Sequence, residues 1–360
     1  MEQPSAPDAL AGTTPVRPAS TSTLDAIRAS DVIGRLAILV VYYLVDDSDL
    51  PLVSIHLDRI AQHTAVPYTI YATAERCPEA GRELLRSRSE VRVCSVTRSE
   101  ARGSREHSVY LDALMRVALE DPEITHICTL DVDSFPVADR WLDHLLTVTP
   151  PASGLAGVLR LENGDTALPH PSCILATRAF FERFRPSFSP DAEHTAEYRK
   201  FIRSTGQAAD TGIRVGSVLW NHRLPWGHVL RTNVENPHYL MAGIYGDIVF
   251  HLGGVGRKKL FRQDLMRARS HRISRRLGRL PAGGSRAVGL LKRRMNTRAR
   301  DAVAAEVSST NRRINKLIRE WLFDDIDELI AYLRGQRVSD RAQVRAAELS
   351  RLGHDSEVGL

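Results

Sequence analysis

The feature that most constrains the fold is the alternation of apolar runs with helical patterns in the first half of the chain. The first run, residues 36–45, is too short to span a bilayer and is rich in β-branched and aromatic residues, which predicts a buried strand. Residues 67–73, 91–96 and 125–130 predict three further strands. Because helical spacing separates these runs, the pattern predicts an α/β protein with a parallel sheet.

Two aspartates, Asp131 and Asp133, directly follow the fourth predicted strand. In open α/β sheets, ligands bind beyond the carboxyl ends of the strands. If the chain stays extended, the two side chains point to the same side, with Cα atoms about 6 to 7 Å apart. Residues 134–136 are then expected to break the strand. The pair predicts a site for a divalent cation such as Mn²⁺ or Mg²⁺, and a capped turn is the structural alternative.

Two further Asp-x-Asp triplets occur, at residues 47–49 and 325–327. The first precedes a helical pattern and offers N-cap groups. The second lies within residues 311–333, whose spacing predicts one long amphipathic helix with these acids on its solvated face. Both are therefore interpreted as structural. Ser104 and Asp139 are predicted to cap the helices that follow them.

Composition indicates a globular protein, with 43% hydrophobic and 26% charged residues. Residues 1–30 are rich in Pro, Ala, Ser and Thr, which predicts a disordered segment. The sequence shows no apolar leader and no run long enough for a membrane span, and its four scattered cysteines form no C-x-x-C pair. A soluble protein in the reducing cytoplasm is therefore expected.

Positive charge is concentrated between Arg257 and Arg300, where 16 Lys or Arg residues accompany a single acid, Asp264. This block contributes a net +15, so without it the net charge of +6 would fall to −9. Such asymmetry suggests an anionic partner, which includes the inner surface of a membrane, a phosphorylated acceptor and nucleic acid. A solvated basic tail is the alternative.

In the order and spacing of its motifs, the sequence resembles the GT-A glycosyltransferases, in particular bacterial members of family 2. The resemblance covers about residues 35–255, and it is carried by the first strand and by residues 107–114, 131–136, 141–145 and 172–178. It implies a GT-A (Rossmann-like) α/β fold, with a mixed, mainly parallel sheet and helices on both faces. It also implies a catalytic domain over residues 31–256, followed by a basic, mainly helical C-terminal extension over residues 257–360.

The resemblance assigns roles to the acidic triplet. It implies a nucleotide-diphosphosugar donor whose diphosphate is bridged to the protein by Mn²⁺ or Mg²⁺, with Asp133 as a direct metal ligand and Asp131 nearer the ribose or the sugar. His251, next to a glycine-rich loop, matches the late histidine that similar enzymes use as a last metal ligand. The alternatives are that His251 is a core residue and that the glycines only make a turn.

Three residues are candidates for donor binding. His107 matches a position near the nucleotide, and at a helix start the helix dipole would disfavour its protonation. The alternative is a histidine that faces solvent. Asp112 lies in the same similar segment, and Glu75 is a loose match for an acid that binds the base or the ribose. The nucleotide itself is not predicted.

Inverting sugar transfer requires a general base for the acceptor hydroxyl. Asp210 matches the position of the catalytic acid in similar enzymes, and a helix N-cap is the alternative interpretation. Asp191, Glu193 and Glu197 are the fallback candidates. The sequence has no Gln-x-x-Arg-Trp signature, so processive synthesis is not expected.

The sequence thus predicts a metal-dependent glycosyltransferase that adds one sugar, with inversion, to a small-molecule, lipid-linked or polymer acceptor. Contact of residues 257–300 with an anionic membrane would make it peripheral at the inner face. One rival is a haloacid-dehalogenase-like phosphatase, but Phe135 stands where that motif has Thr or Val. The other rival is a nucleic-acid-binding protein, which the lack of a stacking platform or a recognisable binding motif disfavours.

Overall fold

The computed structural model describes residues 32–44, 46–190, 195–253 and 286–354. The predicted disordered segment lies outside these residues, and so does the part of the basic block that precedes residue 286. The predicted membrane contact of that block is therefore not addressed by the structure.

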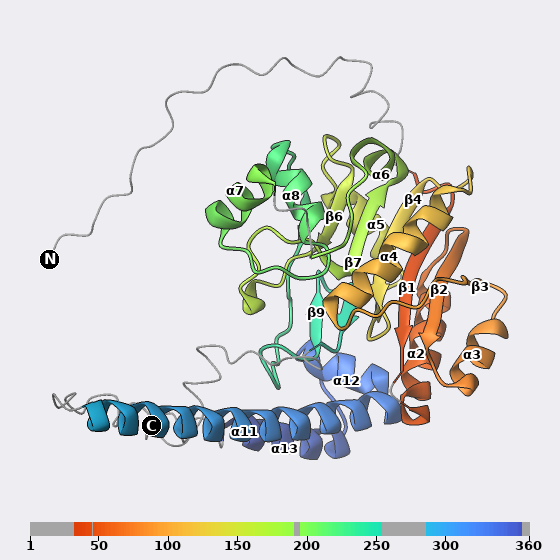
Figure 1. The fold of residues 1–360 in the computed structure, drawn as a ribbon. Coiled ribbons are helices and arrows are strands. Elements are labelled where there is room, and N and C mark those ends of the chain that lie inside the picture. Colours follow the sequence, from red (N-terminus) through yellow and green to blue (C-terminus); the bar gives the residue numbers. More distant parts are fainter. Residues whose placement is uncertain (1–31, 45, 191–194, 254–285, 355–360) are drawn as a thin grey trace, which may run out of the picture.

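A seven-stranded sheet forms the centre of the molecule (Figure 1), in the order β3-β2-β1-β4-β7-β6-β8. β7 runs antiparallel to both of its neighbours, and all the other neighbouring pairs are parallel. The predicted mixed, mainly parallel α/β sheet is therefore confirmed. Its strands are β1 (Leu36–Tyr43), β2 (Tyr68–Arg76), β3 (Val91–Val93), β4 (His126–Asp131), β6 (Leu155–Val158), β7 (His170–Thr177) and β8 (Gly227–Val229).

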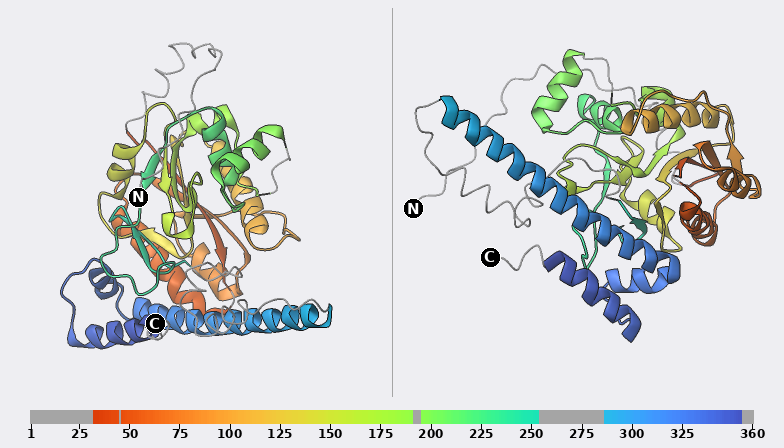
Figure 2. Two further views of the ribbon diagram at one scale, coloured as in Figure 1. Left: turned by 90° about the vertical axis from the view of Figure 1, so that its left-hand side faces the viewer. Right: turned by 60° about the horizontal axis from the view of Figure 1, so that its bottom comes forward.

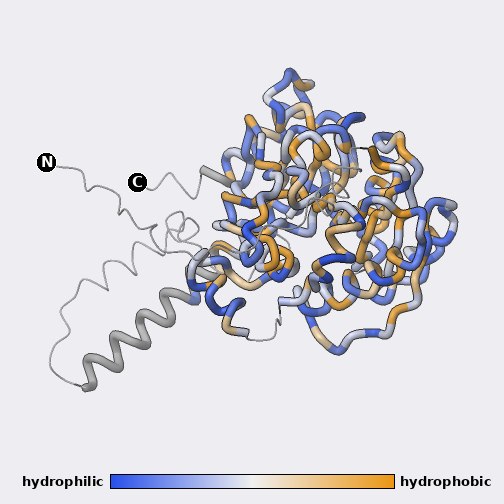
Figure 3. Tube along the Cα trace, turned by 90° about the horizontal axis from the view of Figure 1, so that it is seen from above, coloured by the Kyte–Doolittle hydropathy of each residue, from blue (hydrophilic) through white to orange (hydrophobic). Residues whose placement is uncertain are grey.

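Helices cover both faces of this sheet, and the alternating side chains of β1 define the two cores. Leu36, Ile38 and Val40 point into one apolar cluster, and Ala37 and Leu39 point into the other. The first cluster includes α2 (Leu50–His63), α3 (Glu79–Arg86) and α5 (Trp141–Val148), and the second includes α4 (Ser104–Leu119), α6 (Arg178–Phe184) and α8 (Ile213–Asn221). Hydrophobic stretches accordingly run through the middle of the body, and polar ones form its outer loops (Figure 3).

A second, antiparallel sheet lies beside the carboxyl end of β4. It contains β5 (Ser134–Pro136), β10 (Val249–His251) and β9 (Gly243–Tyr245), in that order. The expectation that residues 134–136 break the strand is therefore wrong, because their backbone pairs with β10. Gly246 and Asp247 connect β9 to β10 with φ of 58° and 60°, the conformation that a tight hairpin turn needs.

The C-terminal helices are α11 (Arg286–Asp324), α12 (Ile326–Leu333) and α13 (Asp340–His354). Figure 2 shows α11 as one long rod along the underside of the body. Ile318, Trp321 and Leu329 are fully buried in a third apolar cluster, which they share with Phe135 and Phe250 of the small sheet. These helices therefore pack against the part of the chain predicted to be catalytic. No described helix combines the length and the apolar character needed to cross a lipid bilayer.

Several predicted helix ends differ in the structure. The helix predicted over residues 311–333 is interrupted at Asp325, whose side chain accepts a hydrogen bond from the N–H of Glu328 and caps α12. Ser104 is the first residue of α4 rather than its cap, and Asp139 is not the cap of α5. Both side chains instead bond residues that are distant in the sequence, and local sequence patterns do not reveal such contacts.

The 47–49 triplet forms the short helix η1 (Asp47–Asp49), which Asp46 caps by accepting a hydrogen bond from Ser48. Asp49 makes no side-chain cap for α2 and instead pairs with Arg319 of α11. The triplet is structural, as predicted, but its role is to join distant helices rather than to cap one. The remaining elements are α7 (Ala196–Thr205) and η2 (Leu161–Asn163).

Candidate metal and donor site

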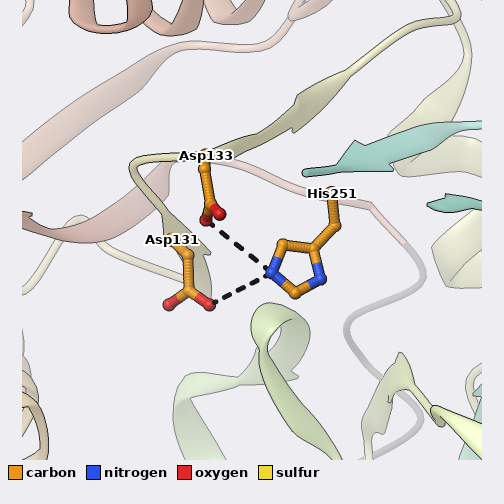
Figure 4. A group of neighbouring side chains, drawn as sticks. All are labelled: Asp131, Asp133 and His251. Atoms are coloured by element: carbon orange, nitrogen blue, oxygen red, sulfur yellow. Dashed lines mark ion pairs between the residues drawn. The ribbon is translucent and has the colours of Figure 1, made fainter. Parts of the chain in front are cut away.

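The sheet places the two acids at its carboxyl edge. Asp131 is the last residue of β4, where it pairs with Val41 of β1. The chain then turns at residues 132 and 133 before β5 begins. The assumption of an extended backbone through the triplet is therefore wrong. The carboxylates nevertheless converge, because the turn directs Asp133 back towards the strand end (Figure 4).

The small sheet brings His251 to the same place from more than a hundred residues away. His251 ends β10 and pairs with Ser134 of β5, which directly follows Asp133. Two more backbone contacts fix this arrangement. The N–H of Leu252 donates to the carbonyl of Asp133 at 2.9 Å, and the N–H of Gly253 donates to its Oδ2 at 3.1 Å. Gly253 has a φ of 63°, which favours glycine at this turn.

Asp131, Asp133 and His251 form a compact group of potential metal ligands (Figure 4). The Nε2 of His251 lies 3.9 Å from Asp131 Oδ2 and 3.7 Å from Asp133 Oδ1. One ligand atom from each residue lies within 4.8 Å of the other two. The side chains are 19%, 18% and 8% exposed, so the group is partly shielded but open to a ligand.

The chemistry of this group fits a divalent cation. Asp131 Oδ1 is buried and accepts no hydrogen bond from the described residues. Burial, together with repulsion from Asp133, raises the pKa of Asp131 to about 7, against the opposing effect of His251. A bound cation would offset both costs. Two carboxylates and one imidazole suit Mn²⁺ better than Mg²⁺, which prefers an all-oxygen shell.

His107 borders the metal group from α4. Its Nε2 lies 3.4 Å from Asp131 Oδ1, and its side chain is 25% exposed. The solvent-facing alternative is therefore wrong. The pKa of His107 is lowered to about 4 by burial, against the opposing charges of Asp210 and Asp133. The expected neutral imidazole is thus present, but burial is the main cause, and the helix dipole is not needed to explain it.

Asp210 lies on the same side of the sheet, in the loop before α8. Its Oδ1 accepts hydrogen bonds from Ser104 Oγ at 2.7 Å and from the N–H of Thr211 at 2.9 Å. The N-cap position of α8 belongs to Gly212, so the capping alternative for Asp210 is wrong. With its side chain 36% exposed, Asp210 is oriented by several partners and remains accessible. Its role as a base stays a prediction.

Sequence reasoning missed two residues of this region, Arg160 and His170. The buried Arg160 bonds Asp165 Oδ2 through Nε at 2.8 Å and approaches Asp210 Oδ2 with Nη2 at 3.5 Å. His170 opens β7, and its ring centroid lies 5.5 Å from that of His251. Arg160 follows shortly after the apolar run of β6, so the rule that selected the acids after β4 would also have selected it.

The other predicted donor-binding residues lie apart from the metal group. Asp112 accepts hydrogen bonds from Ser187 Oγ and from the N–H of Phe188 at 2.7 Å, so both of its oxygens hold a loop. Burial raises the pKa of Asp112. Glu75 is half-buried near the end of β2. The structure joins neither residue to the described ligand group, and their donor-binding roles stay predictions.

Among the fallback bases, Glu197 lies exposed on α7. Asp191 and Glu193 lie outside the described residues. The fallback roles of these residues stay predictions, whereas Asp210 contacts the helix that carries His107.

No protein-family model matches the chain, and no curated protein matches it. Three solved structures are similar in overall shape. A mannosyltransferase from Pyrobaculum calidifontis, in complex with GDP-Man and Mn²⁺, is 10% identical with a TM-score of 0.40, over 94% of this chain and 97% of its own. The galactosyltransferase LgtC, in complex with donor and acceptor sugar analogs, is 10% identical with a TM-score of 0.34, over 54% of this chain and 73% of its own.

The third is a mutant of the Drosophila β-1,4-galactosyltransferase 7, in complex with manganese, UDP-Gal and xylobiose. It is 15% identical with a TM-score of 0.29, over 65% of this chain and 79% of its own. At such low identity and TM-score, the chemistry of this chain has to be derived from its own side chains.

Proposed function

We propose that the chain is a metal-dependent glycosyltransferase of the GT-A type that moves one sugar from a nucleotide-diphosphosugar donor to an acceptor hydroxyl. One observation carries the proposal, namely the group of Asp131, Asp133 and His251 at the carboxyl edge of a mixed α/β sheet. Two carboxylates and an imidazole at a ligand-binding edge suit a cation that also binds phosphate oxygens.

Each side chain of the site has a role in this proposal. Asp133 and His251 would hold Mn²⁺, which would supply positive charge to neutralise the diphosphate of the donor, and Asp131 would lie next to the ribose or the sugar. The imidazole of His107 offers a hydrogen bond to the donor and, because it is neutral, does not repel the cation. In this proposal the diphosphate binds in the partly exposed space between these side chains.

Asp210 acts as the general base in the inverting reaction. It accepts the proton of the acceptor hydroxyl while the oxygen bonds the anomeric carbon and the bond from that carbon to the diphosphate breaks. Its hydrogen bonds from Ser104 and Thr211, and the nearby guanidinium of Arg160, support this role because they orient the carboxylate before the acceptor arrives.

The two rival functions are less consistent with the site. In a dehalogenase-like phosphatase the first aspartate is the nucleophile, whereas here Asp131 is crowded by His107 and His251 on two sides. A nucleic-acid-binding protein would need no buried ligand group of this kind.

The test is a thermal-shift panel of UDP, GDP, dTDP and CDP, each with Mn²⁺, Mg²⁺ or EDTA. We expect one nucleotide to raise the melting temperature only with metal, because a ligand at 100 times its Kd adds about 2.7 kcal/mol of stability. Asp133→Asn should remove this shift. The corresponding sugar nucleotide should then release its nucleoside diphosphate in a turnover assay.

Asp210→Asn is the matched control for the catalytic role. It should lower turnover and leave the metal-dependent shift unchanged. If no nucleotide gives a metal-dependent shift, or if the shift survives Asp133→Asn, the donor site is not where we propose.

A further inference from the structure

A cavity that contains no residue of the metal group lies between α7, α8 and the start of β8. It has a volume of about 720 Å³. Trp220 and Trp226, both partly exposed, line it together with the buried Leu219. The rim is polar and exposed, and consists of Thr166, Glu197, Lys200, Asn221, Arg223 and His228. None of these rim residues belongs to the metal group described above.

The two indoles come from different parts of the core, which explains why a cavity remains between them. Trp220 packs with Phe201 and the small cluster under α7, whereas Trp226 packs against the cluster under α4 and α6. Lys200 lies over the ring of Trp220, with its Nζ 6.0 Å from the centroid. The ring of Trp226 meets His228 edge-on, with centroids 4.2 Å apart. Aromatic surface therefore reaches the cavity with polar groups around it.

The charges around the cavity nearly cancel, so the cavity has no strong preference for a phosphate-bearing ligand. The cavity lies at the carboxyl end of α8, where Leu219, Trp220 and Asn221 carry the negative end of the helix dipole. On the rim, Lys200 and Arg223 bring two positive charges and Glu197 brings one negative charge, and the helix end offsets part of the difference. Such a cavity suits a neutral ligand that has apolar faces and many hydroxyl groups. A pyranose ring has both, because its C–H face packs on an indole while its hydroxyls bond amides, carboxylates and carbonyls.

We propose that this cavity is a binding site for neutral saccharide units, separate from the donor site. Asp210 precedes α8, whereas Trp220 lies near the other end of the helix, about 10 Å of helix rise from its first residue. The site requires neither the metal nor the donor, and the inference therefore stands apart from the proposed function.

The test measures binding of maltohexaose, mannohexaose and galactohexaose to the full chain in EDTA, by calorimetry and by tryptophan fluorescence. Of the four tryptophans, Trp141 and Trp321 are fully buried, so a fluorescence change reports on the two indoles of the cavity. A hexagalacturonate is the charged comparison. We expect at least one neutral hexasaccharide to bind, and the uronate to bind more weakly.

Trp226→Ala should weaken that binding about tenfold, the loss expected for an aromatic stacking contact. Trp226→Phe should retain part of the binding affinity. If Trp226→Ala does not fold, His228→Ala tests the site instead, because His228 is an exposed rim residue. Asp133→Asn should bind the saccharide as the wild type does. The proposal is overturned if no neutral hexasaccharide binds, if only the uronate binds, or if neither Trp226→Phe nor His228→Ala weakens binding.

Discussion

The same short pattern, Asp-x-Asp, has opposite consequences in two regions of this molecule. At the end of β4, Asp131 and Asp133 face two histidines, and no arginine or lysine among the described residues forms an ion pair with them. At the seam where α11 and α12 meet α2, the carboxylates face guanidinium groups instead. Asp49 pairs with Arg319, and Asp327 pairs with Arg59 at 2.8 Å.

The two regions differ in whether an arginine side chain of the protein neutralises the aspartate. At the seam Asp49 and Asp327 each have an arginine, so their charges join different elements of the fold. At the sheet edge two carboxylates lie in a partly buried group without such a partner, and the fold bears the cost of their desolvation and repulsion. A cation taken up from solution would offset this cost, and the proposed metal site rests on that difference.

The largest expected effect distinguishes the two kinds of aspartate directly. Asp133→Asn should reduce sugar transfer by about a thousandfold or more and abolish the thermal response to Mn²⁺, since one ligand is lost. In EDTA its melting temperature should not fall, because the substitution also removes repulsion with Asp131. Asp49→Asn is the matched control, and it should keep the Mn²⁺ response while melting at a lower temperature. The same response in both variants would contradict the comparison.

The second prediction concerns the apolar side of the seam. Trp321→Ala should lower the free energy of unfolding by about 3 to 5 kcal/mol, because Trp321 is fully buried in the third apolar cluster. Trp321→Phe should cost clearly less, since the indole Nε1 makes no hydrogen bond with the described residues. Denaturant unfolding of the three proteins measures the difference. Equal losses in both variants would mean that aromatic packing is not what stabilises this seam.

A double-mutant cycle on Asp49 and Arg319 measures the ionic part of the seam. Their side chains are 14% and 22% exposed. For such a partly buried pair we expect a coupling of about 1 kcal/mol, weaker at high salt. The cycle needs Asp49→Asn, Arg319→Gln and the double variant, each unfolded in urea. If the losses in the free energy of unfolding are strictly additive, the ion pair contributes no coupling energy to stability.

The smallest effect concerns a buried histidine that serves structure rather than ligand binding. His56 bonds the hydroxyl of Tyr42 at 3.0 Å, and burial lowers its pKa from 6.5 to about 3. The unfolded chain therefore takes up a proton before the folded one does. The stability due to neutral His56 is complete above pH 6.5 and is lost as the pH falls, by about 1 kcal/mol between pH 6.5 and 5.5.

Because other histidines also titrate, the measurement compares the pH dependence of unfolding in the wild type and in His56→Gln. The glutamine keeps an acceptor for Tyr42 and has no charge to gain. A wild type that loses no more stability than His56→Gln would show that His56 is not held neutral by the fold.

Local patterns were sufficient for the strands of the first half of the sheet, β1 to β4, but they did not predict β6, β7 or β8. The apolar runs that became β1, β2 and β4 predicted their type and order, since a buried parallel strand needs a continuous run of such residues. The same rule placed Asp131 and Asp133 at a ligand-binding edge. The assignment of His251 came from resemblance, and the structure places its ring beside both acids.

What the sequence did not predict depends on long-range contacts. β5 is only three residues long, and it exists because β10 pairs with it. The predicted caps Ser104 and Asp139 failed because Asp210 and His63 bond them from distant parts of the chain. Arg160 follows the short strand β6, so the strand-end rule could have selected it, but its pairing with Asp165 and Asp210 is visible only in the fold.

The stacked rings of Phe135 and Phe250, with centroids 5.1 Å apart, belong to the small sheet that carries His251. Both rings are buried in the cluster that the C-terminal helices complete. As the chain is synthesised, these helices follow the metal ligands, so the small sheet lacks its apolar cover until they have emerged and docked. The position of the histidine that completes the ligand group therefore depends on apolar contacts supplied by helices that follow it in the sequence.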